Sequence, residues 1–195
     1  MVRHHELVMQ SDSAAQGDRA PSLLTSGERT EIEVVAGDFD TFYTKHRNEI
    51  GSALGFTLGS QALGEEAVDE AMARAYQQWK KVGQYENAAG WVYRAGLNWG
   101  RSWQRSMFRR KRREESVARS AETTTELTGV RPELMEALSD LSIDQRAVVV
   151  LRYYCDWTVE DTATALDITE GTVKSRSSRG LERLRGSLGT IGDPS

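Results

Sequence analysis

Five cations lie within one short stretch near the C-terminal end of the sequence. The stretch ITEGTVKSRSSRGLERLR contains Lys174, Arg176, Arg179, Arg183 and Arg185. Lysines and arginines at this density neutralise phosphates, and a helix that carries them on one face fits a nucleic-acid groove. The whole chain nevertheless has a formal net charge of −4. The chemistry of this stretch therefore points to a polyanion, although the overall composition does not.

Charge is segregated along the chain. Residues 1–40 carry eight acidic and three basic residues, whereas residues 101–113 carry seven basic residues and no acidic one. The distribution of charge decides where a polyanion can bind, more than the sum does. Residues 101–113 are therefore a local basic segment, and the acidic segments lie elsewhere.

The C-terminal cations follow the spacing of a helix-turn-helix. Thr158 and Asp161 predict a capping box at the start of one short helix. Residues 167–169 then predict a turn with Ile168 as its apolar plug, and Thr169 predicts the N-cap of a second helix. The inward stripe of that helix would be Val173, Ser177, Leu181, Leu184 and Leu188. In this motif the second helix enters the major groove.

Side chains away from the inward stripe can contact a nucleic acid. They are Lys174, Ser175, Ser178 and Arg179, and Arg176 borders the same face. Cations and hydroxyls of this kind bind base edges and phosphates. These residues alone leave an alternative open, in which the helix is a solvated basic surface and Glu182 pairs with its neighbours.

Three helices are predicted in the N-terminal half of the chain. The apolar spacing of residues 39–59 predicts an amphipathic helix with Asp38 as its cap. Residues 63–79 predict a helix with an acidic outer face, and residues 91–113 predict one that becomes basic toward its end. Residues 1–37 lack a sustained period and predict a mobile extension.

A linker separates these helices from the helix-turn-helix region. Residues 112–131 are rich in Thr, Ser and Glu and lack periodicity. Pro132 suits the first turn of a following helix. Ser142 predicts the N-cap of the next one, which continues to about Tyr153. The predicted fold is all-α, with two small helical domains joined by a flexible linker.

The composition excludes several classes of protein. No apolar run approaches the ~20 residues of a membrane span, and no secretory signal is visible, so we expect a cytoplasmic protein without membrane insertion. Cys155 is the single cysteine, and the three histidines form no ligand pattern with it. We therefore predict no metal and no cofactor. The chain also lacks a phosphate loop and a nucleophile with a matched base, which argues against an enzyme.

Three segments resemble one protein family. Residues 141–185 resemble the C-terminal promoter-binding domain of bacterial RNA polymerase sigma factors of the extracytoplasmic-function (ECF) class, in the sigma-70 superfamily. Residues 65–76, EEAVDEAMARAY, resemble the core-polymerase-binding helix of that family, and residues 91–103, WVYRAGLNWGRSW, its promoter-melting helix. The resemblance implies a sigma factor that binds core polymerase, recognises the −35 and −10 elements and opens the promoter for transcription initiation.

The resemblance also implies domain boundaries. They are a disordered extension at 1–37, a region 2-like domain at 38–111, a linker at 112–131, a region 4-like helix-turn-helix domain at 132–189 and a tail at 190–195. The implied partners are core polymerase, through the coiled coil of its largest subunit and the flap of its second subunit, and promoter DNA in double- and single-stranded form. An anti-sigma factor is a possible further partner.

The resemblance assigns residues to three surfaces. The −35 surface comprises Arg152, Thr169, Thr172, Lys174, Ser175, Arg176, Ser178 and Arg179. The −10 and melting surface comprises Tyr85, Asn87, Asn98, Arg101, Trp103, Arg105 and Arg109. The core-polymerase surface comprises Glu66, Asp69 and Glu70. Aromatic rings beside arginines can stack unpaired bases and neutralise phosphates, although core packing is the favoured role of Trp91 and Trp99.

Some positions depart from the family pattern. Asp69 stands where the family usually has Gln, and Ser178 replaces a larger residue. Ser177 occupies an inward position that is normally aliphatic, so it should loosen the packing unless its hydroxyl bonds a carbonyl one turn earlier. A stand-alone helix-turn-helix regulator remains the alternative function, and it would bind specific DNA tightly without polymerase.

Overall fold

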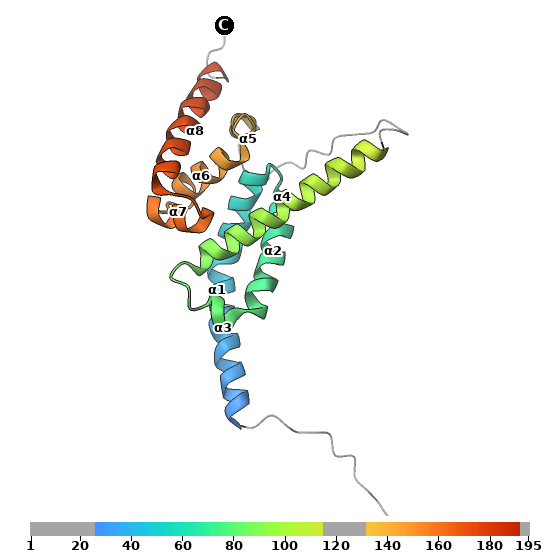
Figure 1. The fold of residues 1–195 in the computed structure, drawn as a ribbon, viewed down its shortest axis with the longest axis vertical. Coiled ribbons are helices and arrows are strands. Elements are labelled where there is room, and N and C mark those ends of the chain that lie inside the picture. Colours follow the sequence, from blue (N-terminus) through green and yellow to red (C-terminus); the bar gives the residue numbers. More distant parts are fainter. Residues whose placement is uncertain (1–25, 115–131, 192–195) are drawn as a thin grey trace, which may run out of the picture.

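The structure, a computed structural model, describes residues 26–114 and 132–191. All eight regular elements in these ranges are helices, as the all-α prediction requires. The N-terminal domain contains α1 (Ser26–Leu58), α2 (Gln61–Gln77), α3 (Trp79–Val82) and α4 (Ala88–Glu114). The C-terminal domain contains α5 (Pro132–Ser139), α6 (Ile143–Tyr153), α7 (Val159–Leu166) and α8 (Glu170–Ile191). Figure 1 shows α5–α8 grouped beside the bundle formed by α1, α2 and α4.

Two predicted boundaries are wrong. α1 begins at Ser26 rather than at Asp38, so part of the predicted extension is helical. α4 continues to Glu114, beyond the predicted start of the linker at residue 112. A helix that has formed adds residues at little cost, and its ends need not follow the apolar pattern. The rest of the extension and of the linker lies outside the described residues.

A tight corner joins α1 to α2. Gly59 has φ +80, in the left-handed region that glycine adopts without strain, and this ends α1. The Ser60 side chain then accepts a hydrogen bond from the Leu63 N–H at 3.3 Å and caps α2. The two helices cross so closely that a Cβ on Gly64 would overlap the Gly55 backbone. The corner therefore holds α2, with its acidic face, rigidly against α1.

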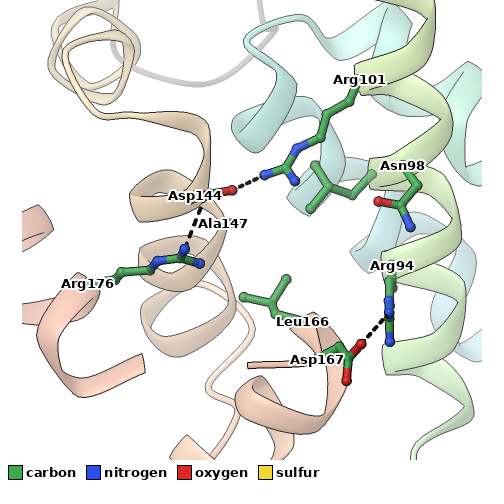
Figure 2. A pocket seen from close by; sticks show the side chains of 9 residues that line it. Arg94, Asn98, Arg101, Asp144, Ala147, Leu166, Asp167 and Arg176 are labelled. Atoms are coloured by element: carbon green, nitrogen blue, oxygen red, sulfur yellow. Dashed lines mark hydrogen bonds and ion pairs between the residues drawn. The ribbon is translucent and has the colours of Figure 1, made fainter. Parts of the chain in front are cut away.

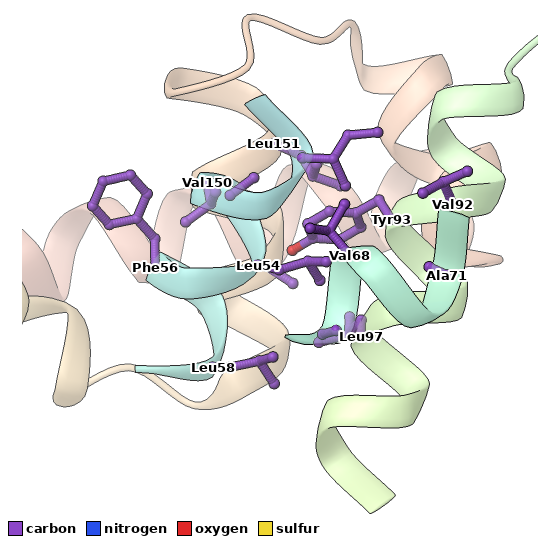
Figure 3. Close-up of a cluster of buried hydrophobic side chains, with 14 of the residues drawn as sticks. Leu54, Phe56, Leu58, Val68, Ala71, Val92, Tyr93, Leu97, Val150 and Leu151 are labelled. Carbon is purple, nitrogen blue, oxygen red and sulfur yellow. The ribbon is translucent and has the colours of Figure 1, made fainter. Parts of the chain in front are cut away.

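The core extends through both domains. Leu54, Val68 and Tyr93 are fully buried between α1, α2 and α4, and Leu151 of α6 belongs to the same hydrophobic cluster (Figure 3). The Tyr93 and Thr57 hydroxyls bond each other at 2.7 Å inside this cluster. Burial raises the pKa of the Tyr93 phenol because the phenolate would be desolvated. The expectation of two tethered domains did not include this shared core.

The predicted caps of the C-terminal helices are confirmed. Ser142 forms a capping box with Gln145 at the start of α6, and Thr158 forms one with Asp161 at the start of α7. Ile168 packs, as predicted, against the small cluster of Val148, Ala163 and Val173. These contacts fix the angle between α7 and α8.

The inward stripe of α8 is confirmed in its first part. Val173, Ser177 and Leu184 are buried, and Leu181 is half-buried. Leu188 was predicted inward but is 40% exposed, because the last part of α8 extends past its neighbours (Figure 1).

Within 26–114 and 132–191, every helix is too short or too polar to cross a bilayer.

Candidate nucleic-acid and polymerase interfaces

The outer face of α8 presents the predicted recognition residues. Lys174, Ser175, Ser178 and Arg179 are all exposed, while Val173 and Ser177 face the core between them. Lys174 pairs with Glu170 at 3.1 Å, and both side chains are more than half exposed. Such a surface pair contributes little and leaves the lysine available to a phosphate.

The N-terminus of α8 is capped as predicted. The Thr169 hydroxyl accepts a hydrogen bond from the Thr172 N–H at 3.2 Å, and the two hydroxyls lie 2.9 Å apart. Ser175 donates to the Thr172 carbonyl at 3.1 Å. The exposed end of α8 is therefore well ordered and carries the positive end of the helix dipole, which favours phosphates.

Ser177 has a partner other than the expected one. Its hydroxyl lies 3.1 Å from the Tyr153 phenol of α6, so a side chain of a neighbouring helix satisfies it instead of a carbonyl one turn earlier. The same contact fixes Tyr153 against α8. A hydrogen bond between helices thus replaces the aliphatic packing that is usual at this position.

Two predicted −35 residues are used inside the fold. The Arg152 guanidinium donates to the Trp157 carbonyl and lies 5.9 Å from the ring centre of Tyr153. Arg176 pairs with Asp144 of α6 at 3.2 Å. Both arginines therefore stabilise the helix-turn-helix, whether or not they also contact DNA.

The loop before α4 brings Tyr85 and Asn87 together. Tyr85 is 39% exposed, and the Asn87 side-chain oxygen accepts the Gly90 N–H at 2.6 Å, which caps α4. A cavity of about 390 Å³ lies beside them, and its walls include His46 of α1 and Trp157 of the C-terminal domain. Burial lowers the pKa of His46, and the neighbouring charge of Lys45 acts in the same direction. His46 therefore favours its neutral form here.

Asn98 and Arg101 lie on the face of α4 that meets the C-terminal domain. They line an interdomain cavity of about 150 Å³ together with Arg94 (Figure 2). Arg101 forms an ion pair with Asp144, and Arg94 forms one with Asp167 at 2.7 Å. Arg94 was not among the predicted site residues, although it lies one helical turn before Asn98.

The remaining basic part of α4 extends into solvent. Trp103, Arg105 and Arg109 are exposed, as a nucleic-acid surface requires. Trp91 and Trp99 are half-buried against the core, which confirms their predicted packing role. Phe108 is 68% exposed on the same segment, and no sequence signal had singled it out.

The acidic face of α2 contains the predicted polymerase-binding residues. Glu66 is exposed, and Glu70 pairs with Arg74 at 2.8 Å. The Arg47 Nε and Nη2 atoms each donate to an Asp69 carboxylate oxygen at 2.9 Å, and this hydrogen bonding raises the pKa of Arg47. This pair of hydrogen bonds explains why an acid suits position 69, where the family usually has Gln. A Gln side chain has one acceptor oxygen to offer Arg47, whereas the Asp69 carboxylate has two.

Comparison with known proteins identifies the C-terminal region and the family of the chain. Residues 131–184 match the family described as sigma-70, region 4. The chain is 34% identical over 127 residues to the RNA polymerase sigma-E factor of Streptomyces antibioticus, covering 65% of this chain and 71% of that protein. It is 31% identical over 140 residues to the ECF RNA polymerase sigma factor SigL of Mycobacterium tuberculosis, covering 69% of this chain and 79% of that protein.

A solved structure shows the same fold. It is the sigma factor RpoE of Bartonella quintana, in complex with the anti-sigma factor NepR, with a TM-score of 0.66 at 21% identity. The match covers 77% of this chain and 96% of that chain. The names of the sequence relatives favour a sigma factor over a stand-alone regulator. The chain therefore belongs to the ECF sigma factors of the sigma-70 superfamily, and it directs promoter recognition by RNA polymerase.

Proposed function

We propose that the exposed face of α8 reads the −35 element. The observation that carries this proposal is the division of α8 into a buried stripe and an outer face with Lys174, Ser175, Ser178 and Arg179. A helix of this kind presents side chains to base edges while its buried side stays fixed to the domain. Thr169 and Thr172 at its start are placed to bind the backbone phosphate next to the helix N-terminus.

The −10 element is assigned to α4 and the loop before it. Tyr85 and Trp103 expose aromatic rings that can stack on unpaired bases. Arg101, Arg105 and Arg109 supply positive charge along the same helix, and Asn98 supplies an amide for a base edge. Asn87 acts mainly as the helix cap that fixes the loop.

The acidic face of α2 is assigned to core polymerase. Glu66 is exposed and would pair directly with a basic element, such as the coiled coil of the largest subunit. Asp69 and Glu70 already hold internal arginines, so they would share those pairs on docking. The C-terminal domain would contact the flap of the second subunit. Because polymerase works in the cytoplasm, this function also places the chain there.

An anti-sigma factor is a proposed regulator. The RpoE of Bartonella quintana, which shares the fold, was solved with its anti-sigma factor NepR. A protein that covers α4 or α8 of this chain would block the proposed promoter contacts.

Transcription with purified core polymerase tests the assignment. Core plus this chain should select a set of promoters from fragmented genomic DNA, and Arg179→Ala should weaken promoter binding and lower the salt slope of log affinity by about 1. Lys81→Ala is the matched control, because it removes one exposed charge from α3, away from α8. A chain that binds specific duplex DNA tightly but never associates with core would overturn this function in favour of a stand-alone regulator.

A further inference from the structure

An exposed tyrosine at the end of α6 lies beside the recognition face of α8. Tyr153 is 55% exposed, and its hydroxyl lies 3.1 Å from the Ser177 hydroxyl on the flank of α8. We propose that Tyr153 contacts the sugar–phosphate backbone at the edge of the −35 element, and that Ser177 positions its hydroxyl for this contact. This inference rests on the proposed reading of the −35 element by α8.

Close packing of α6 against α8 brings Tyr153 to this place. A Cβ on Gly180 would lie 2.7 Å from the Val149 Cγ2 atom, so the two helices cross with almost no space between them. Tyr153 lies one helical turn after Val149, and Ser177 lies nearly one turn before Gly180. The seam between the helices therefore runs from the buried contact of Val149 to the exposed contact of Tyr153.

The exposed neighbours of Ser177 on α8 are residues that are proposed to bind DNA. Lys174 lies three residues before Ser177, Ser178 directly follows it, and both are exposed. Residues three apart on a helix lie side by side. The Tyr153 ring therefore lies at the edge of the recognition face, next to Lys174. A side chain at this edge meets the backbone that borders the groove, whereas the centre of the face meets base edges.

Two contacts hold the Tyr153 ring while more than half of its surface stays in solvent. The Ser177 hydroxyl holds its polar end, and the Arg152 guanidinium lies 5.9 Å from its ring centre. Arg152 also donates to the Trp157 carbonyl, so it is itself fixed. A side chain that is ordered before binding loses little conformational entropy when it meets DNA. Tyr153 is therefore preorganised for a contact on its exposed side.

The chemistry of a phosphate sets the direction of both hydrogen bonds. A phosphate oxygen only accepts, and tyrosine hydroxyls are among the groups that donate to DNA phosphates. A hydroxyl has one hydrogen to donate and can accept as well, so on DNA the Tyr153 hydroxyl would donate outward and accept from Ser177. Ser177 is 8% exposed, which shields its hydroxyl from water that would otherwise compete for it.

The pair with Tyr153 also gives a function to the departure from the family pattern at Ser177. An aliphatic side chain at position 177 would pack against α6 but could not donate to the phenol. The serine gives up apolar packing and supplies a donor behind the hydroxyl that meets the DNA. We therefore expect the two side chains to act as a unit.

Tyr153→Phe tests the contact, because it keeps the ring and removes only the hydroxyl. Core polymerase with this variant should bind a promoter fragment, recovered in the selection from genomic DNA, about tenfold more weakly than with the wild-type chain. The salt slope of log affinity should not change, since a neutral hydroxyl releases no counterion. Tyr154→Phe is the matched control, because Tyr154 is 49% exposed and turns its ring to Phe56 instead. Wild-type affinity in Tyr153→Phe, or an equal loss in Tyr154→Phe, would overturn the contact.

Neutral substitutions in the DNA backbone show whether the hydroxyl meets a phosphate. In a set of fragments that each carry one methylphosphonate in or beside the −35 element, one position should weaken the wild-type complex much more than the Tyr153→Phe complex. A hydroxyl that only stabilises the fold would give the same profile of losses in both proteins, and that result would overturn the proposal.

Ser177→Ala tests the positioning role. It should lower the affinity for the promoter fragment by about threefold in the wild-type chain and have no effect in Tyr153→Phe, as expected of a coupled pair. Equal effects in both chains would overturn the role of Ser177. If core with the wild-type chain selected no promoter at all, the proposed function itself would fail, whereas promoter selection with unchanged affinity in Tyr153→Phe would overturn only this inference.

Discussion

At the scale of the residue, Arg146 joins the ends of two helices and the turn that follows α5. Its guanidinium donates to the Thr57 carbonyl at 3.2 Å, to Ser139 at 3.3 Å and to Leu141 at 3.2 Å. Thr57 and Ser139 lie in the last turns of α1 and α5, where carbonyl groups lack helical partners and favour a nearby cation. Burial lowers the pKa of Arg146, but arginine stays charged at neutral pH.

Replacement of Arg146 by Met should destabilise the fold. The carbonyls would lose charge-assisted hydrogen bonds, and the expected loss is about 2 kcal/mol in the free energy of unfolding, measured by urea denaturation. Arg146→Lys should recover only part, since an ammonium group cannot span three carbonyls in a fork. Arg74→Met removes an exposed arginine and should cost about 0.5 kcal/mol or less. Equal losses in Arg146→Met and Arg74→Met would contradict this role.

His46 should make stability depend on pH. Burial lowers its pKa below the usual 6.5, so between the two pKa values the unfolded chain binds a proton that the folded chain does not. The free energy of unfolding should therefore rise as pH increases through the window just below 6.5, and then level off. Urea denaturation at a series of pH values measures this rise, and His46→Gln should flatten it. The same slope in both proteins would rule out His46 as its source.

At the scale of the element, the capping box of α7 carries a clear prediction. The Thr158 hydroxyl accepts the Asp161 N–H at 3.0 Å and donates to the Asp161 carboxylate at 2.6 Å. Thr158→Ala should lose about 1 kcal/mol in the free energy of unfolding, because α7 is short and depends on its cap. Thr164→Ala, at an exposed position of the same helix, should be neutral or slightly stabilising, since Ala favours helices. Thermal unfolding of the two variants checks the contrast, and losses of equal size would contradict the capping role.

Local signals predicted the helix-turn-helix well, because caps and turns depend on neighbouring residues. Thr158, Asp161 and Thr169 act as their spacing predicted. The start of α1 was missed, since no apolar period extends back to Ser26. The interdomain pairs were missed for another reason. Asp144 meets Arg101 from far along the chain, and such a contact depends on how finished helices pack rather than on local spacing.

In the candidate site, the exposed residues were predictable and the internal ion pairs were not. The exposed face of α8 follows from helical periodicity, so Lys174 and Arg179 were placed correctly on the surface. Arg152 and Arg176 have the same residue type but turn toward Trp157 and Asp144. Residue type alone cannot distinguish an arginine that stabilises the fold from one that can bind DNA. Both kinds donate hydrogen bonds to oxygen acceptors, and only the folded structure shows whether a protein acceptor lies near.

At the scale of the whole molecule, the interface on α4 joins the two domains. Buried residues of both domains form one hydrophobic cluster, and Asp144 and Asp167 pair with arginines of α4. Because burial of apolar surface is the main stabilising contribution to a fold, each domain depends on the other for part of its stability.

The two interdomain ion pairs give the last prediction. The pair Asp144→Asn and Asp167→Asn should lower the free energy of unfolding by about 1 kcal/mol, because it removes two partly exposed ion pairs that hold α4 to the C-terminal domain. Urea denaturation measures the loss, with Glu136→Gln plus Glu160→Gln as the charge-matched control. An equal loss in the control would mean that the effect comes from the change in net charge and not from the two ion pairs.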